Sequence, residues 1–157
     1  MQQAIALIVS IAVAQIAGFL GTLFTADAIP SWYVTLAKPW FTPPSWVFAP
    51  VWTILYTLMG VAAYLIYKRR KVSPGTERAL LIYTLQLTLN SAWSVIFFGA
   101  HELGWALIEM IVLAATIAYT MVLFARIDRR AAALLLPYLA WVLFAAALNT
   151  SIWRLNA

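Results

Sequence analysis

Five long stretches of apolar residues, separated by short polar or charged segments, constrain the fold of this chain more than any other feature of its sequence. Each stretch is long enough to cross about 30 Å of hydrocarbon as a helix that rises about 1.5 Å per residue. In lipid a spanning segment must satisfy its own backbone hydrogen bonds, so an open chain can cross only as helices. We therefore predict an all-α membrane protein, a single bundle of five transmembrane helices that forms one domain over residues 1–157. The predicted helices cover about residues 4–24, 46–67, 79–99, 103–124 and 131–153.

The composition supports lipid as the solvent around most of the chain. Hydrophobic residues make up 65% of it and charged residues only 10%, with a mean hydropathy of +0.91. A soluble domain has about 25% charged residues, because it must cover its core with a polar surface. The chain has no cysteine and one histidine. It therefore excludes disulfides and thiolate chemistry, and it predicts no metal site and no required cofactor.

The basic residues gather in two connecting segments and so predict the orientation in the membrane. These segments, residues 68–78 and 126–130, lie on the same side as the N-terminus when five helices are threaded through a bilayer. By the positive-inside rule the N-terminus is cytoplasmic and the C-terminus is outside, in a cytoplasmic (inner) membrane. We expect the first helix to remain in the mature protein, because no positive residue precedes it. The basic residues form short clusters between the apolar stretches and no continuous surface that could follow a phosphate backbone, so we expect no nucleic-acid partner.

Eight tryptophans in so short a chain need an explanation. Trp46, Trp105 and Trp153 fall toward helix ends, as in the aromatic belts at membrane–water interfaces. Trp52, Trp93 and Trp141 lie deeper, where an indole N–H needs a partner, so these three are expected to face the bundle interior. Each belongs to a stripe at helical spacing, and the stripes hold Phe48, Trp52, Tyr56 and Met59; Gln86, Asn90, Trp93 and Phe97; and Trp141, Ala145, Leu148 and Ile152.

Asn90 has two interpretations that the sequence leaves open. Polar side chains at membrane depth usually point inward, where they either bond a neighbouring helix or line a ligand site. Three inward aromatic stripes and one Asn, all in the outer half of the membrane, favour a pocket for a flat, mostly apolar ligand.

The first connection, residues 25–45, predicts a lid over that pocket. Three prolines within six positions restrict the backbone, and four aromatic residues make the segment apolar. Such a connection is too stiff and too apolar to be a solvated linker. We expect it to fold over the outer end of the bundle.

In the same segment, residues 32–44 read W-Y-x-x-L-x-K-P-x-x-x-P-P, and further motifs follow in order along the chain. They are Pro50-Val51-Trp52, Leu89-Asn90-Ser91-Ala92-Trp93, Phe97-Phe98-Gly99, Gly104-Trp105-Ala106-Leu107-Ile108-Glu109, Pro137-Tyr138-Leu139-Ala140-Trp141 and Leu148-Asn149. Over its whole length the chain resembles the translocator protein / tryptophan-rich sensory protein family, also called peripheral-type benzodiazepine receptors.

The resemblance implies a five-helix, usually dimeric membrane protein whose cavity under the first loop binds porphyrins, sterols and benzodiazepine-type ligands. A homodimer in the lipid bilayer and a tetrapyrrole ligand, protoporphyrin IX or haem, are therefore the expected partners. Thr150 stands where the sterol pattern of the animal proteins needs a tyrosine, so a tetrapyrrole is favoured over a sterol. The ligand-binding residues carried over, with Phe48 and Leu148 as plausible neighbours, are Tyr33, Phe48, Trp52, Asn90, Trp93, Trp141, Ala145 and Leu148.

Three functions follow from the resemblance and stay open at this point. The chain could sense or pass on tetrapyrroles as a receptor, move them across the bilayer, or degrade porphyrin in a light- and oxygen-dependent reaction. Trp52 and Trp141 match the positions proposed for the degradation, and no other catalytic residue is predicted. Crowding of the polar and aromatic features in one half of the membrane argues against a path through it.

Three further features have a structural and a functional interpretation. Glu109 is the only acid well inside a helix, and we expect its carboxyl to bond a neighbouring helix or reach the interface, with ligand or proton handling as the alternative. His101 is interpreted as a turn residue. The small residues Ser10, Ala14 and Gly18 permit close helix packing, either inside the monomer or between copies.

Overall fold

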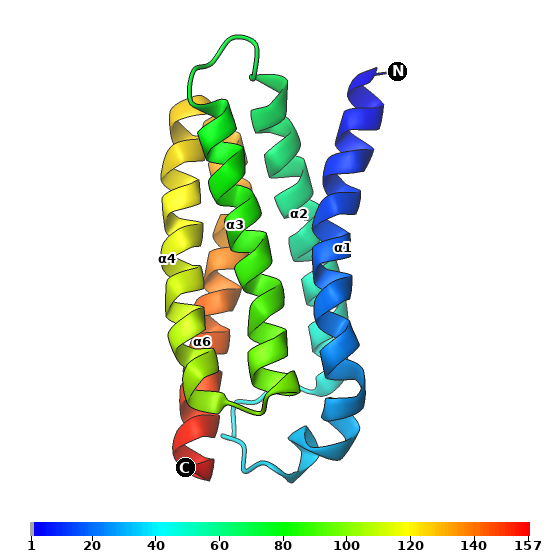
Figure 1. The fold of residues 1–157 in the computed structure, drawn as a ribbon, viewed down its shortest axis with the longest axis vertical. Helices are drawn as coiled ribbons and strands as arrows, with labels where there is room; N and C mark the ends of the chain where they lie inside the picture. Colours follow the sequence, from blue (N-terminus) through cyan, green and yellow to red (C-terminus); the bar gives the residue numbers. More distant parts are fainter. Residues whose placement is uncertain (1) are drawn as a thin grey trace.

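The computed structural model describes residues 2–157 and confirms an all-helical architecture, in which five helical segments are long and apolar enough to cross a membrane. The helices pack side by side along one axis (Figure 1). Their bounds are α1 Gln2–Ser31, α2 Phe48–Lys68, α3 Thr76–Ser94, α4 Leu103–Ile127, α5 Arg129–Leu134 and α6 Leu136–Asn156, with short turns η1 Tyr33–Thr35, η2 Ser45–Val47 and η3 Val95–Gly99.

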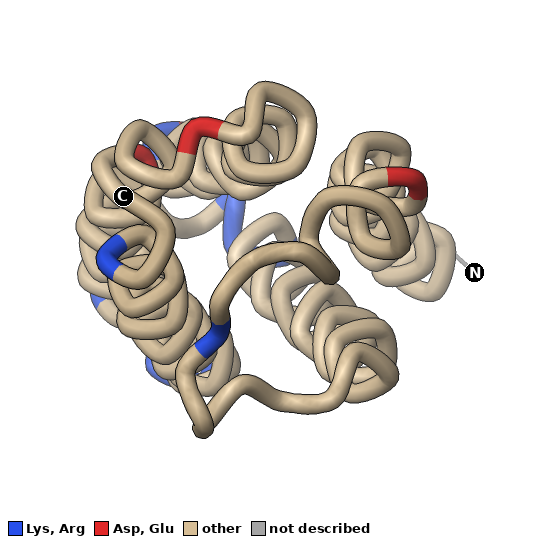
Figure 2. The backbone as a smooth tube through the Cα atoms, turned by 90° about the horizontal axis from the view of Figure 1, so that it is seen from below, with Lys and Arg blue, Asp and Glu red and all other residues tan. Residues whose placement is uncertain are grey.

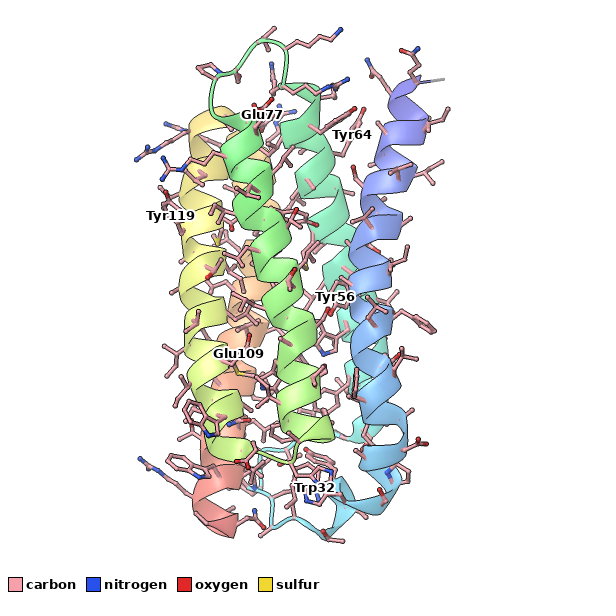
Figure 3. The ribbon with its side chains drawn as sticks, in the orientation of Figure 1. Trp32, Tyr56, Tyr64, Glu77, Glu109 and Tyr119 are labelled. Atoms are coloured by element: carbon pink, nitrogen blue, oxygen red, sulfur yellow. The ribbon has the colours of Figure 1, made fainter. Side chains whose placement is uncertain are left out.

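The N-terminus and the two basic connections lie at one end of the bundle, which we call the basic end. Tyr64, Glu77 and Tyr119 lie toward this end, whereas Trp32 lies at the other (Figure 3). Figure 2 looks onto that other end, where the connection between α1 and α2 crosses the ends of the helices. The α1 helix packs on α2 and α3, and α4 packs on α3 and α6.

The first helix is longer than the sequence predicted. It continues through Ser31 instead of ending at Phe24, so the start of the loop at residue 25 was wrong and the connection begins at Trp32. Between Phe24 and Pro30 there is no Gly or Pro to end the helix, and Pro30 itself lies in the last turn. Hydroxyl groups in this stretch bond the helix itself, as Ser31 Oγ does by donating to Asp27 O at 2.6 Å.

The fifth predicted helix, residues 131–153, is interrupted at Leu135 and so consists of α5 and α6. Pro137 causes the break, because it has no N–H to donate to the carbonyl four residues earlier. Leu135 N bonds Ala132 O at 3.1 Å, a tighter turn than the α-helix, and regular bonding resumes with Leu139 N to Leu135 O at 3.0 Å.

The third span also changes its geometry, at its end far from the basic connections. Residues Val95–Gly99 form a π-helical turn, closed by Ala100 N donating to Val95 O at 2.8 Å. The turn leaves Phe97 only 2% exposed. His101 then adopts a positive φ of 59°, so it does occupy a tight turn before α4.

Small side chains let α1 and α2 approach closely. Ala14 is fully buried, and a Cβ placed on Gly60 would lie 2.5 Å from the Cα of Ile11. Further along α1, a Cβ on Gly21 would lie 2.9 Å from the Ser94 hydroxyl of α3. Part of the small-residue face of α1 therefore packs inside the molecule.

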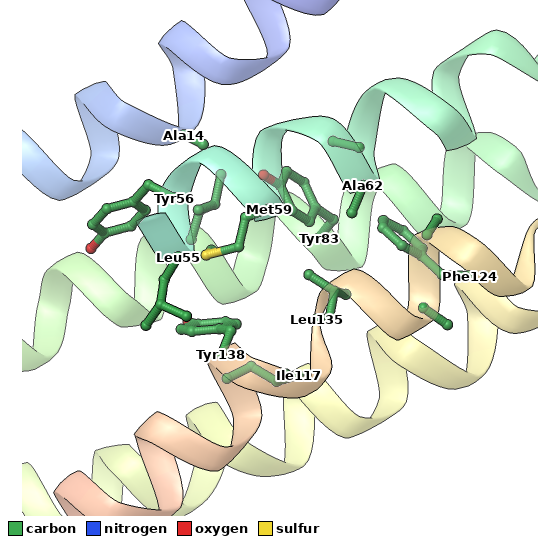
Figure 4. Packing of buried hydrophobic residues seen from close by; sticks show 14 of the residues in the cluster. Ala14, Leu55, Tyr56, Met59, Ala62, Tyr83, Ile117, Phe124, Leu135 and Tyr138 are labelled. Atoms are coloured by element: carbon green, nitrogen blue, oxygen red, sulfur yellow. The ribbon is translucent and has the colours of Figure 1, made fainter. Parts of the chain in front are cut away.

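The main core fills the middle of the bundle and its basic half. Met59 of α2, Ile117 and Phe124 of α4 and Tyr138 of α6 are fully buried there, as Figure 4 shows from close by. A second, smaller cluster around Tyr33, Phe97 and Ile152 lies under the α1–α2 connection. The space between these two clusters is not filled by side chains.

Candidate functional site

A cavity of about 480 Å³ lies between the two clusters, enclosed by α1, α2, α3, η3 and α6. Its size falls in the usual range for small-molecule sites. All eight predicted ligand-binding residues line it: Tyr33, Phe48, Trp52, Asn90, Trp93, Trp141, Ala145 and Leu148. The three deep indoles therefore do face the interior.

Aromatic side chains form much of the cavity wall. Trp52 stacks on Tyr56 with ring centroids 5.4 Å apart and meets Tyr138 edge-on at 6.3 Å. Trp93 packs on Phe97 at 5.0 Å. Because each ring is held by another ring, the walls are rigid, flat and apolar.

Trp141 is fixed in the same way on α6. Its ring contacts Phe48 of α2 edge-on at 6.0 Å and Phe144 at 5.4 Å. Phe144 in turn meets Phe41 of the connection at 6.3 Å. This chain of aromatic contacts closes the seam between α2 and α6 on the cavity side.

The polar side chains of the cavity come from several elements, among them α1, α2, α3 and α6. Asn90 Oδ1 accepts a hydrogen bond from the Tyr56 hydroxyl, which links α3 to α2. Asn90 is therefore both a contact between helices and a lining residue. The Trp93 Nε1–H is buried out of reach of water and has no partner among residues 2–157, so the indole presents its ring and not its N–H to the cavity.

The connection after α1 roofs the cavity, with Tyr33 as its inward side chain. Tyr33 is 8% exposed and packs against Phe98, with ring centroids 5.8 Å apart. Burial raises the pKa of the Tyr33 phenol, so the hydroxyl stays neutral and able to donate at physiological pH. The Lys38 ammonium lies 4.7 Å from the centre of the Tyr33 ring and donates to Leu36 O at 3.1 Å.

Two further contacts hold this roof in place. Trp32 stacks on His101 with centroids 4.1 Å apart. Ala37 N donates to Asn156 Oδ1 at 3.0 Å, and Asn156 Nδ2 donates to Ala37 O at 2.9 Å. The end of α6 thus clamps the main chain of the connection, a role that no pattern around Asn156 predicts.

Sequence reasoning missed the contribution of α1 to the cavity. Gln15, Gly18, Thr22 and Thr25 all line it. These small and polar residues recur at intervals of three and four along an otherwise apolar helix, so a signal was present. Gln15 Nε2 donates to Thr53 O and to Thr57 Oγ1, both at 3.0 Å, and so bridges α1 to α2.

Two other residues singled out in the sequence lie outside the cavity lining. Gln86 is 1% exposed, and its amide has no partner among residues 2–157. Both carboxyl oxygens of Glu109 are buried and also lack a partner within that range, so the expected bond from Glu109 to a neighbouring helix is not formed. Both residues are candidates for hydration inside the bundle.

The cavity offers surfaces for binding more than groups for acid–base or metal chemistry. Within residues 2–157, no group of three His, Cys, Asp or Glu side chains is placed to hold a metal ion. The lining is instead made mainly of aromatic rings, hydroxyl groups and the three amides of Gln15, Asn90 and Asn149. Such a surface recognises a flat molecule by stacking and a few hydrogen bonds.

Comparison with known proteins agrees with this architecture. The sequence model of the TspO/MBR family matches residues 10–154. The translocator protein of Homo sapiens is 43% identical over 141 residues, which cover 88% of this chain and 82% of that protein. The tryptophan-rich protein TspO of Archaeoglobus fulgidus is 40% identical over 151 residues, covering 96% of this chain and 97% of its own length. The tryptophan-rich sensory protein of Cereibacter sphaeroides is 40% identical over 136 residues, 87% of this chain and 82% of its own. The chain therefore belongs to the TspO/MBR family of integral, multi-pass membrane proteins.

Proposed function

We propose that this protein is a membrane receptor of the sensory type that binds tetrapyrroles, protoporphyrin IX or haem, in the roofed cavity and takes part in their handling or transport. The observation that carries the proposal is the set of three inward tryptophans around one empty space. The relatives whose names contain "sensory" and "translocator" agree with a receptor role. Benzodiazepine-type and sterol-like molecules are further candidate ligands of the same cavity.

The macrocycle, the polar side chains and the carboxylates of a tetrapyrrole each have a matching group in or above the cavity. Its macrocycle is flat and apolar, which suits a space lined by Trp52, Trp93 and Trp141. Its polar side chains can bond the hydroxyl of Tyr33, which is among the lining residues. Its carboxylates need a cation, and Lys38 is the only one in residues 25–45.

The orientation and assembly complete the proposal. The basic end faces the cytoplasm of a cytoplasmic (inner) membrane, which places the N-terminus inside, the cavity in the outer half and the C-terminus outside. Two copies form a homodimer in the bilayer.

Fluorescence provides the direct test of binding. Protoporphyrin IX titrated into the protein in lipid nanodiscs should quench tryptophan emission to saturation at low-micromolar concentration. Trp93→Ala should weaken binding by about tenfold, because losing one ring stack costs about 1 kcal/mol or more. Trp105→Ala is the matched control, since Trp105 is 65% exposed and lies outside the lining. Quenching that never saturates in the unmutated protein would refute the proposal.

Light-driven porphyrin degradation is a second candidate function, favoured by the position of two oxidisable indoles. Trp52 and Trp141 both line the cavity, on different helices. Molecular oxygen would be the oxidant and the excited porphyrin the absorber of light.

The double variant Trp52→Phe plus Trp141→Phe separates the two candidate functions. It should keep porphyrin binding, because phenyl rings preserve the flat walls, but lose any product formed under illumination. Absorbance spectra of illuminated complexes measure the product. Equal bleaching in the original protein, in the variant and in protein-free solution would leave the receptor as the only function.

A further inference from the structure

We propose that the ligand enters and leaves the cavity sideways, from the lipid, through an opening between α1 and α2, which we call the side portal. The portal is bordered by Phe19, Thr22, Ser45, Ala49 and Thr53. This inference rests on the proposed function, because it concerns the route to the same cavity.

The first observation is where the cavity lining is uncovered. Most lining residues are buried or half-buried by the rest of the protein. The exceptions belong to α1, to η2 or to the start of α2, and they are the five portal residues; Phe19, for example, is 64% exposed. The cavity wall is therefore incomplete on one side only, and that side faces the bilayer.

The second observation is that the other seams around the cavity are closed. Ser91 Oγ of α3 donates to Ala17 O of α1 at 2.8 Å, and Gly21 packs against Ser94 in the same seam. The seam between α2 and α6 is closed by the contact of Phe48 with Trp141. Toward water, the roof is clamped by the two hydrogen bonds between Ala37 and Asn156.

The third observation concerns the border of the portal. Thr22 Oγ1 donates to Phe19 O at 2.7 Å, and Thr53 Oγ1 donates to Ala49 O at 2.9 Å. Because both hydroxyls already donate within their own helices, a passing apolar ligand leaves no buried donor unpaired there. Toward the basic end the portal stops at Gln15, whose side chain bridges to Thr53 and Thr57.

The depth of the portal fits a ligand dissolved in the membrane. Ala49 and Thr53 lie in the first two turns of α2, within about 9 Å of the start of that helix at a rise of about 1.5 Å per residue. A flat apolar ring with carboxylate side chains resides at this level of a bilayer, with the ring in hydrocarbon and the charges among the headgroups.

Two variants close the two alternative routes. Ala49→Trp places a large ring in the portal, and Ile54→Trp, at a position that is 60% exposed and outside the lining, is its matched control. Ala37→Cys plus Asn156→Cys, oxidised to a disulfide, locks the roof. The chain has no cysteine of its own to interfere.

Stopped-flow quenching by protoporphyrin IX in nanodiscs then measures exchange. Ala49→Trp should slow association and dissociation together, by about tenfold for each 1.4 kcal/mol added to the barrier, while Kd changes little. Ile54→Trp and the locked roof should leave both rates unchanged. As a second test, Gln15→Leu removes the bridge at the portal edge and should accelerate both rates.

Two results would overturn the side portal. One is a locked roof that abolishes exchange while Ala49→Trp exchanges normally, which would indicate entry from water. The other is unchanged rates in Gln15→Leu together with an Ala49→Trp protein that associates at the original rate and only dissociates faster, which would mean that the new ring perturbs the bound ligand and not its route. Failure of the proposed function is distinct from both, because the unmutated protein would then show no saturable binding.

Discussion

At the scale of single residues, the hydrogen bond between Tyr56 and Asn90 does the most to define the cavity. The bond engages the Oδ1 atom of Asn90, which lines the cavity, so the Nδ2 amino group is the part of this amide left for a ligand. Both residues are buried, at 8% and 5% exposure, and the bond joins α2 to α3. The bond thus couples the shape of the site to the stability of the bundle.

Tyr56→Phe should therefore destabilise the protein. Removing the hydroxyl leaves the Asn90 oxygen buried and unpaired, which costs about 1–3 kcal/mol. The measurement is the midpoint of thermal unfolding in one detergent. Tyr67→Phe, at a residue that is 37% exposed, is the control and should unfold like the original protein. Equal midpoints for both variants would contradict the role given to this bond.

The inward direction of residues such as Trp52, Trp93 and Trp141 could be predicted from the sequence, because depth in a helix and an indole N–H that needs a partner leave few alternatives. The clamp by Asn156 could not be predicted in this way, because it joins the connection after α1 to the end of α6, and these two segments meet only in the folded chain. Tyr33 was predicted as a ligand-binding residue only from the family resemblance, because it lies in the connection and belongs to no stripe at helical spacing.

At the scale of whole elements, the close approach of α1 and α2 depends on Gly60. A Cβ at this position would lie 2.5 Å from Ile11 Cα and 2.9 Å from Ser10 O, both in the backbone of α1. Backbone atoms cannot turn aside as a side chain can, so any larger residue must push the helices apart.

Gly60→Ala should lower stability by about 1–3 kcal/mol, as overpacked cores do. Gly104→Ala is the matched control, because its Cβ would meet only the Trp153 ring, at an ordinary 3.5 Å. Alanine is also the better helix former by about 0.5–1 kcal/mol, so the control should hold or gain stability. Comparison of the unfolding midpoints decides, and a Gly60→Ala protein as stable as the control would disprove the argument.

The number and type of these elements followed from the length and apolar character of each stretch. The residues at which the helices end could not be predicted in the same way, because they depend on local features of the chain. The extension of α1 to Ser31 depends on the absence of Gly and Pro between Phe24 and Pro30, and the division at Leu135 depends on the missing N–H of Pro137. Apolar residues continue through both places, so hydropathy alone does not mark them.

At the scale of the whole molecule, we expect the uneven distribution of charge to set the orientation in the membrane. The basic end carries the residues of both basic connections, and its Asp128 is already engaged by Arg69 at 3.8 Å. The excess of positive charge there remains large, whereas the other end has Lys38 and Arg154. Lipid-facing apolar residues cover the middle, as Ile8, Ile54 and Ile111 do with more than half of their surface exposed.

Cysteine labelling in intact cells should reveal this orientation. Trp40→Cys, at a position that is 95% exposed on the roof, should react with a membrane-impermeant maleimide from outside. Val72→Cys, 74% exposed in a basic connection, should react only after the cells are opened. The reverse pattern would mean that the basic end lies outside.

The π-helical turn at Val95–Gly99 has a consequence for how this scaffold can diversify. Such a turn holds one residue more than the α-helical path between the same ends. Loss of a single codon in this stretch would restore regular α-helical geometry without breaking the span. Phe97 and Phe98 would rotate about the axis while the rest of the bundle kept its register. The shape of the space beside them can therefore be retuned by one change in chain length, with no need to replace any of the surrounding rings.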